Sequence, residues 1–175
     1  MKAAAISEFS TPPTVQEKPD PEPGEGQIVV DVEYASINGM DLAVWAGYTK
    51  DYMPYEMPLT LGRDFAGRVA AVGAGVTGLE VGDAVFGALA TADLYFGTFA
   101  EKLPVAAATV AKRPAGLDAR TAAALALAGT AAQTAIDALD LGRGETVLVA
   151  GATGGVGAIA VQLAAARGAT VIATA

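Results

Sequence analysis

The sequence predicts a mixed fold, in which a strand-and-turn domain at residues 1–117 precedes the first βαβ unit of a doubly wound α/β domain at residues 118–175. Three observations support this prediction. Up to about Pro114, short apolar runs alternate with Gly and Pro, a pattern typical of strands and turns. An alanine-rich, helical stretch follows Asp118. From Thr146 onward, an apolar strand, a glycine turn, a helix and a second strand follow one another, which implies a parallel sheet covered by helices.

The N-terminal part is expected to consist mainly of strands. The tract from Thr11 to Gly26 is predicted to be an exposed connection, because its prolines prevent a helix. A short helix is expected at Met40–Ala46, and the glycines between Val72 and Asp83 are spaced for tight turns. The expected strands are Lys2–Ile6, Gln27–Tyr34, Phe65–Val72, Ala84–Gly87, Gly97–Leu103 and Thr109–Lys112.

The C-terminal part is expected to alternate helices and strands. Asp118 is a good N-cap residue, and we expect two helices between it and about Leu139, separated at Gly129. Gly168 supplies the left-handed stop of the last helix. The remaining elements are expected to be a strand at Thr146–Ala150, a helix at Val156–Arg167 and a strand at Thr170–Thr174.

The composition excludes several classes of function. The 175 residues include 11 Lys and Arg against 19 Asp and Glu, and the resulting net charge of −8 disfavours binding to a nucleic-acid backbone. Without Cys or His, the chain has no disulfide, no thiolate or imidazole metal ligand and no histidine acid/base pair. The first ten residues do not resemble a signal peptide, and no apolar stretch is long enough to span a membrane. We therefore expect a cytoplasmic protein.

The strongest chemical motif is the glycine-rich turn Val149–Gly157. From Ala152 it matches the dinucleotide fingerprint G-x-G-x-x-G with Ala at the first Gly, and the strand–turn–helix–strand context makes the match specific. Gly154 and Gly155 would let the backbone approach a pyrophosphate, while Gly157 would let the helix and strand pack closely. The N-terminus of the helix would offer free N–H groups to the phosphates. The alternative is a tight turn that binds no ligand.

The residue that selects the cofactor is expected about 20 positions further on, where an acidic side chain favours NAD and a basic one NADP. That position lies after Ala175. A doubly wound fold also needs two βαβαβ halves, so we expect this sequence to be a fragment or one part of a larger assembly. Because such a chain exposes a sheet edge and apolar helix faces, we expect poor solubility, a homodimer, or association with a complementing segment.

The order of these parts, together with three segments, resembles the medium-chain dehydrogenase/reductase superfamily. The segments are Leu61–Val69 (LGRDFAGRV), the glycine turn Val72–Asp83, and Gly97–Glu101 (GTFAE). Within that superfamily the chain looks most like the zinc-independent quinone oxidoreductases. The resemblance implies a GroES-like catalytic domain of β-barrel type, then a Rossmann domain, with the active site between them. It also implies hydride transfer from NADPH, or alternatively NADH, to a quinone or an α,β-unsaturated carbonyl.

The zinc-dependent branch of the superfamily has Cys, His and Glu ligands in two segments, which correspond here to Ser36–Asp41 and Gly62–Asp64. The matching positions here hold Asn38, Arg63 and Asp64. A thiolate and an imidazole are both missing, and a guanidinium would repel a cation. The four-cysteine lobe that binds a structural zinc in that branch is also absent. The resemblance therefore implies an enzyme that works without a metal.

The same resemblance suggests roles for four residues of the cleft, of which Asn38 and Asp41 would line its nicotinamide end. Asn38 would hydrogen-bond the cofactor or substrate, and Asp41 would orient that network. The alternative for both is helix capping, since Asn is a good N-cap and a carboxylate is favourable in a first turn. Tyr48 and Tyr52 lie in the loop expected at the rim of the substrate site, where a hydroxyl would donate to a developing enolate oxygen. The alternative for each tyrosine is an aromatic packed at the edge of the core.

Two further positions have open roles. Arg63 would contact an anionic substrate or a cofactor phosphate, or else form an ion pair with Asp64, which is the preferred interpretation. The segment Leu127–Ala132 resembles the family's Gly-x-Thr-Ala, whose Thr faces the nicotinamide, but here Ala131 takes that place and Thr130 comes one step earlier. The expected cofactor-binding residues are Thr130, Ala152, Thr153, Gly154, Gly155, Val156 and Gly157.

Two other hypotheses remain at the level of sequence. The shifted Thr130 and the incomplete sheet are compatible with a non-catalytic nucleotide-binding or scaffold protein of the same fold. The same order of domains would also suit an enoyl reductase from a multidomain synthase. Turnover of a quinone or enone would separate the catalytic hypotheses from the non-catalytic one.

Overall fold

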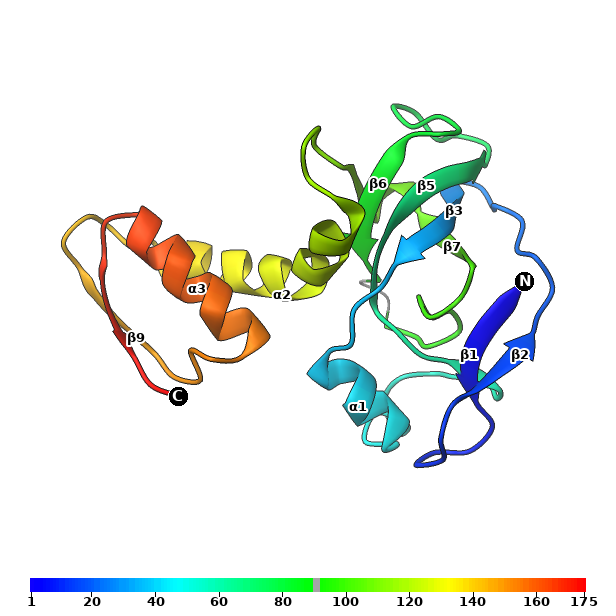
Figure 1. Cartoon of the computed structure of the whole chain (residues 1–175), viewed down its shortest axis with the longest axis horizontal. Coiled ribbons are helices and arrows are strands. Elements are labelled where there is room, and N and C mark those ends of the chain that lie inside the picture. The colour runs from blue at the N-terminus through cyan, green and yellow to red at the C-terminus, as the bar shows by residue number, and fades with distance from the viewer. Residues whose placement is uncertain (90–91) are drawn as a thin grey trace. The chain divides into compact units, whose positions relative to one another are not determined.

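The computed structural model describes residues 1–89 and 92–175, and it divides into two compact units, residues 1–124 and 125–175. The division falls within helix α2, Ala119–Ala138, so this helix contributes to both units (Figure 1). Each unit has a hydrophobic core of its own. The domain boundary predicted between residues 117 and 118 lies just before α2 and stays a prediction.

The main element of the first unit is a five-stranded antiparallel sheet with the order β7-β3-β5-β6-β8. The central strands β3 and β5 pair from Ile28 opposite Val72 to Tyr34 opposite Ala66. The predicted bounds are confirmed for β3, and those of β5, β6 and β8 differ from the observed ones by one residue. The strands are β3 Gln27–Tyr34, β5 Asp64–Val72, β6 Ala84–Ala88, β7 Lys102–Ala106 and β8 Val110–Lys112.

The core of this sheet is formed by large apolar side chains on three adjacent strands. Ile28 and Val30 on β3, Phe65 on β5 and Leu103 on β7 are all fully buried. The two β3 residues are spaced by two, so they lie on the same face of the strand. Each such buried side chain contributes about 1.5–3 kcal/mol to folding. This packing fixes the start of β5, which directly follows the predicted site residue Arg63.

A second, three-stranded sheet has the order β2-β1-β4, with β1 at Lys2–Ile6, β2 at Thr14–Glu17 and β4 at Leu59–Thr60. The prediction for β1 is confirmed, and β4 was not predicted. β2 lies inside the tract predicted to be a connection, so that prediction is wrong for these four residues. The prolines only flank β2, and its β-branched start suits an edge strand, where Val15 is 73% exposed.

The strand predicted at Gly97–Leu103 is displaced, because β7 begins later in the sequence. The residues before β7 join the two sheets instead of forming a regular ladder. The N–H of Ala4 in β1 donates to the carbonyl oxygen of Phe99 at 2.7 Å, and the N–H of Val32 in β3 donates to that of Glu101 at 2.9 Å. Because residues 99–101 bond to strands of two different sheets, they do not form a continuous ladder with either strand.

Unit 1 also contains two short helical segments. Helix α1 spans Gly39–Trp45 and begins one residue before its predicted start, and the 3₁₀ turn η1 at Ala107–Thr109 links β7 to β8. Among the helices of residues 1–89 and 92–175, none is long and apolar enough to cross a membrane.

Helix α2 is continuous, so the predicted break at Gly129 is wrong. Gly129 does not adopt a positive φ and lies in the middle of the helix among alanines. A glycine in a helix costs about 1 kcal/mol relative to Ala, which neighbouring alanines of high helix propensity can offset. Gly129 therefore lowers the stability of α2 locally but does not end the helix.

The second unit contains the predicted βαβ motif, which is confirmed. Strand β9 at Thr146–Val149 and strand β10 at Thr170–Ala173 pair in parallel, and helix α3 at Gly155–Ala166 connects them. The core is small and rich in alanine, which allows the helices to approach closely. Its buried members are Ala132, Ile136, Val147, Ala160 and Ala164.

Several local signals in the sequence are confirmed. Gly75, Gly78 and Gly82 adopt positive φ angles in the turn between β5 and β6. Asp118 caps α2, because its carboxylate accepts the backbone N–H of Thr121 at 2.9 Å and the hydroxyl of the same residue at 2.8 Å. The backbone hydrogen bond is the largest cause of a lowered pKa at Asp118.

The continuity of α2 can be tested at its glycine. We expect Gly129→Ala to raise the free energy of unfolding by about 1 kcal/mol, because Ala has the higher helix propensity and a Cβ at this position would meet only the Cβ of Leu125, at 3.9 Å. Chemical denaturation monitored by circular dichroism would measure the change. A loss of stability would contradict a continuous helix and favour two helices separated at this residue.

Candidate functional site

One predicted site residue of unit 1, Asn38, bonds to the carboxylate of Asp64, the first residue of β5. Asp64 is fully buried, and its Oδ1 accepts the backbone N–H of Ser36 at 2.7 Å. Its Oδ2 accepts the Ser36 hydroxyl at 2.7 Å and the side-chain amide of Asn38 at 2.9 Å. A buried carboxylate needs donors of this kind to offset its loss of hydration. These bonds fasten the connection that follows β3 to the start of β5.

Asn38 and Asp41 form a capping box at the start of α1. Asn38 is the N-cap residue, with φ −120° and ψ 162°, and its backbone N–H donates to Oδ2 of Asp41 at 2.7 Å. The capping interpretation is therefore confirmed for both residues. A contact of either residue with a cofactor or substrate stays a prediction.

The Asp41 carboxyl is unusual because it is only 3% exposed and incompletely bonded. Its Oδ1 is buried without a hydrogen-bond partner among the described residues. Burial is the largest cause of a raised pKa at Asp41, and the nearby negative charge of Asp64 raises it further. The N–H of Asn38 and the charge of Arg63 act in the opposite direction. Asp41 therefore binds a proton more readily than an ordinary aspartate does.

Arg63 is buried, and its guanidinium donates to backbone oxygens, namely those of Leu89 at 2.8 Å and Asp93 at 3.1 Å. Because Asp64 turns instead toward Ser36 and Asn38, the preferred ion pair between Arg63 and Asp64 is wrong. Burial lowers the pKa of Arg63, while the charges of Asp41 and Asp93 raise it. The guanidinium thus supports the segment that follows β6.

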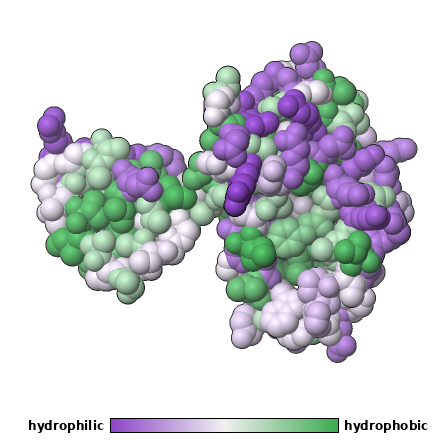
Figure 2. All heavy atoms as spheres, viewed as in Figure 1, coloured by the Kyte–Doolittle hydropathy of each residue, from purple (hydrophilic) through white to green (hydrophobic). Residues whose placement is uncertain are grey.

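Tyr48 and Tyr52 are 76% and 68% exposed, so the alternative of aromatics packed at the core edge is wrong for both. They follow α1, and two further exposed apolar side chains lie in the same part of the chain, Ile37 just before the N-cap of α1 and Leu42 within the helix. Figure 2 shows hydrophobic surface over this part of the first unit. An apolar surface next to buried polar groups is a suitable place for an apolar ligand.

The glycine turn of the second unit leaves the N-terminus of α3 free. Gly154 is the N-cap, and its own N–H donates to the carbonyl oxygen of Gly151 at 3.0 Å. The first helical hydrogen bond runs from the N–H of Ala158 to the oxygen of Gly154 at 2.9 Å. The N–H groups of residues 155–157 therefore have no acceptor within the helix, and they can bind an anion.

Gly157 makes the close approach that the fingerprint requires, but its neighbour is the turn itself and not the strand. A Cβ at Gly157 would overlap the carbonyl oxygen of Gly151 and the Cα of Ala152. A Cβ at Gly155 would lie at 3.6 Å from the Cβ of Ala128 on α2, an ordinary contact. Gly157 is thus required for the shape of the turn, whereas Gly155 is not.

The remaining predicted cofactor residues are tied to the backbone. The hydroxyl of Thr130, an exposed residue on α2, donates to the carbonyl oxygen of Ala126 at 2.7 Å and keeps its capacity to accept a hydrogen bond. The N–H of Ala152 donates to the oxygen of Thr174 at 2.8 Å, which holds the turn against the end of β10. Contacts of Thr130, Ala152 and Thr153 with a cofactor stay predictions.

The sequence analysis missed the central role of Asp64 and did not consider Ser36. The available signal was a carboxylate at the start of an otherwise apolar, buried strand, since a charge there needs several donors. Within residues 1–89 and 92–175, no group of three or more His, Cys, Asp or Glu side chains is placed to hold a metal ion.

The raised pKa of Asp41 gives a testable pH dependence. Its contribution to stability is fully present below the unfolded-state pKa of about 3.9 and is lost as the pH rises through the higher folded-state pKa. We therefore expect Asp41→Asn, which cannot ionise, to gain stability relative to the wild type between pH 4 and pH 7, as measured by thermal denaturation across this range.

Asp83→Asn is the control for that measurement, because the hydrogen bond from Lys112 lowers the pKa of Asp83. This variant should instead lose stability relative to the wild type as the pH rises over the same range. If both variants showed the same trend, the raised pKa of Asp41 would be contradicted.

Comparisons with known proteins place the chain in a family. The alcohol dehydrogenase GroES-like domain matches residues 24–115. Human quinone oxidoreductase is 34% identical over 179 aligned positions, which cover 100% of this chain and 53% of the human protein. The chain therefore spans about half the length of this relative.

Solved structures agree with the sequence matches. An alcohol dehydrogenase superfamily protein from Novosphingobium aromaticivorans is 39% identical with a TM-score of 0.91, covering 100% of this chain and 53% of that one. A mycobacterial protein in complex with NADPH is 33% identical with a TM-score of 0.87, covering 99% and 52%. The chain thus belongs to the medium-chain dehydrogenase/reductase superfamily, with an alcohol dehydrogenase GroES-like domain, and it is quinone-oxidoreductase-like.

Proposed function

We propose that this chain is part of an NAD(P)H-dependent oxidoreductase that reduces a quinone or an α,β-unsaturated carbonyl without zinc. The observation that carries the proposal is the turn before α3. It combines the extended N-cap Gly154, a close approach at Gly157 and three unpaired helical N–H groups at residues 155–157. This combination suits a pyrophosphate, which needs both close backbone access and N–H donors.

A bound nicotinamide would supply the hydride, and the protein would position the reactants. On this proposal the Ser36–Asp64–Asn38 network holds the polar side of the substrate site in place. The exposed apolar side chains around α1, with Tyr48 and Tyr52, would receive the apolar acceptor. This arrangement requires no acid/base histidine, in agreement with the composition.

The proposed independence from zinc rests on the chemistry of the donor set. Asn38 already donates its amide to Asp64, and Arg63, the residue directly before Asp64, carries a buried positive charge. A cation would be repelled by that guanidinium and would meet neither a thiolate nor an imidazole. The preference for NADPH over NADH is supported by the mycobacterial relative, whose structure contains NADPH.

We also propose that the second unit associates with further protein, as a homodimer or with a complementing segment, in the cytoplasm. Leu148 and Ile172 lie opposite each other on β9 and β10 and are 64% and 53% exposed. A cross-strand apolar pair of this kind is normally covered.

A non-catalytic nucleotide-binding protein is the second candidate. It is favoured by the hydroxyl of Thr130, which bonds to the helix backbone, by the carboxylate of Asp41, which caps α1, and by the amide of Asn38, which bonds to Asp64. NADPH binding without turnover of any quinone or enone would support this candidate.

The cofactor proposal can be tested with Gly154→Val. A Cβ at Gly154 would lie 3.4 Å from the oxygen of Gly151, so the variant is expected to fold, while its side chain would occupy the space next to the free N–H groups. We expect NADPH affinity, measured by isothermal titration calorimetry, to fall by at least about tenfold, equivalent to roughly 1.4 kcal/mol.

The matched control is Ala165→Val, which places the same valine side chain at an exposed residue near the other end of α3. It should bind NADPH as the wild type does. Equal affinity of wild type and Gly154→Val would contradict the proposed cofactor site.

A further inference from the structure

A cavity of about 350 Å³ lies in the first unit, at residues that the proposed reaction does not use. Its walls come from the start of β1, the tract before β3, and the segment that leads into β7. The lining residues that matter for its chemistry are Asp20, Gln27, Tyr95, Phe96, Lys102 and Pro104. A cavity of this size can hold a small organic molecule.

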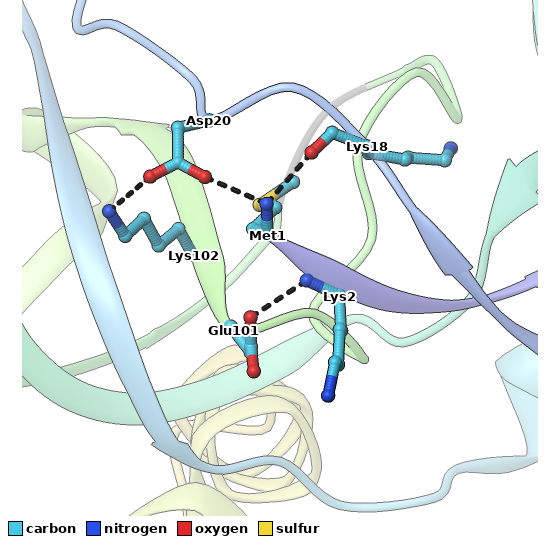
Figure 3. A network of polar contacts seen from close by, with 6 residues as sticks. All are labelled: Met1, Lys2, Lys18, Asp20, Glu101 and Lys102. Carbon is cyan, nitrogen blue, oxygen red and sulfur yellow. Dashed lines mark hydrogen bonds and ion pairs between the residues drawn. The ribbon is translucent and has the colours of Figure 1, made fainter.

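At one end of the cavity, two positively charged groups of the protein hold the carboxylate of Asp20. The carboxylate of Asp20 accepts a hydrogen bond from the Met1 amino group at 2.8 Å and forms an ion pair with the ammonium of Lys102 (Figure 3). The bond from Lys102 is the largest cause that lowers the pKa of Asp20, to about 2. Asp20 is therefore ionised at neutral pH and is held between two positive groups.

The protein holds the Asp20 carboxylate only weakly, because the side chain of Asp20 is 54% exposed to solvent. It lies in the proline-containing tract between β2 and β3, outside any strand or helix. An exposed ion pair of this type has little net stability, so a carboxylate from solution can compete for the same donors. The second acidic residue of the lining, Glu22, belongs to the same tract.

Another part of the cavity is lined by aromatic rings and prolines. Tyr95 and Phe96 are about half exposed, at 49% and 48%, and Pro19, Pro21 and Pro104 also line the cavity. Half-exposed aromatic rings beside prolines offer flat surfaces on which an apolar group can pack. The cavity thus combines an apolar region with the cationic groups of Met1 and Lys102, and Lys18 also lines it, in a chain whose net charge is −8.

We propose that this cavity is a binding site for a small carboxylate with an aromatic or aliphatic body. The carboxylate of the ligand takes the place of Asp20 on the Lys102 ammonium, and its body packs on Tyr95 and Phe96. The site lies wholly within the first unit and is independent of the proposed nicotinamide site.

The test uses benzoate as the probe and its neutral analogue benzyl alcohol as the comparison, with binding followed by amide chemical shifts in ¹⁵N-labelled protein. Asp20→Asn should bind benzoate roughly fivefold more tightly, because the competing charge is removed. Lys102→Met should bind it roughly fivefold more weakly, because the cationic partner is lost. In both, the amides of Tyr95 and Phe96 should shift.

Lys112→Met is the matched control, since Lys112 is an exposed lysine paired with Asp83 and does not line the cavity. It should leave benzoate affinity unchanged, and benzyl alcohol should not distinguish among the variants. Thermal denaturation would confirm that each variant is folded.

Three results would overturn the proposal. They are an absence of benzoate binding in Asp20→Asn, the same loss in Lys112→Met as in Lys102→Met, and equal effects of the substitutions on benzyl alcohol. None of these outcomes depends on NADPH binding or turnover, so the carboxylate site and the proposed reductase activity can fail separately.

Discussion

The organisation of the first unit depends on one buried charge, the carboxylate of Asp64. Its position at the start of β5 removes it from water, and the desolvation must be offset by donors from elsewhere in the chain. Ser36 and Asn38 supply those donors, and the connection after β3 is drawn against β5 as a result. Helix α1 then begins directly after Asn38, so the capping box and the exposed apolar residues around α1 take their places from this single requirement.

The second unit is organised by backbone crowding. At Gly157 the chain comes so close to Gly151 that only a residue without a Cβ fits, and the turn that results leaves the first N–H groups of α3 unpaired. The small alanine side chains of α2 and α3 allow the close packing of this unit. The candidate site of the first unit is therefore shaped by the buried charge of Asp64. The candidate site of the second unit is shaped by the absence of a Cβ at Gly157.

Features that depend on residues close together in the sequence were predicted more accurately than features that depend on residues far apart in the sequence. The βαβ motif and the cap at Asp118 depend on neighbours close in sequence, and both were predicted correctly. The strand before Lys102 was misplaced because Phe99 bonds to β1, which is almost a hundred residues away in the sequence. The break at Gly129 was wrong because a propensity for turns was given more weight than the surrounding alanines.

The strand-and-turn character of the first unit, the βαβ motif and the glycine turn could all be predicted from the amino-acid order, because periodicity and glycine spacing act through the local backbone. The composition also showed that no histidine or cysteine chemistry is available. Only the tertiary structure decided that Asp64 bonds to Ser36 and Asn38, that Arg63 turns to Leu89, and that Asp20 meets Lys102 across 82 positions of the chain. The partners of a charged group are set by which segments fold against it, and that information is not contained in any local stretch of sequence.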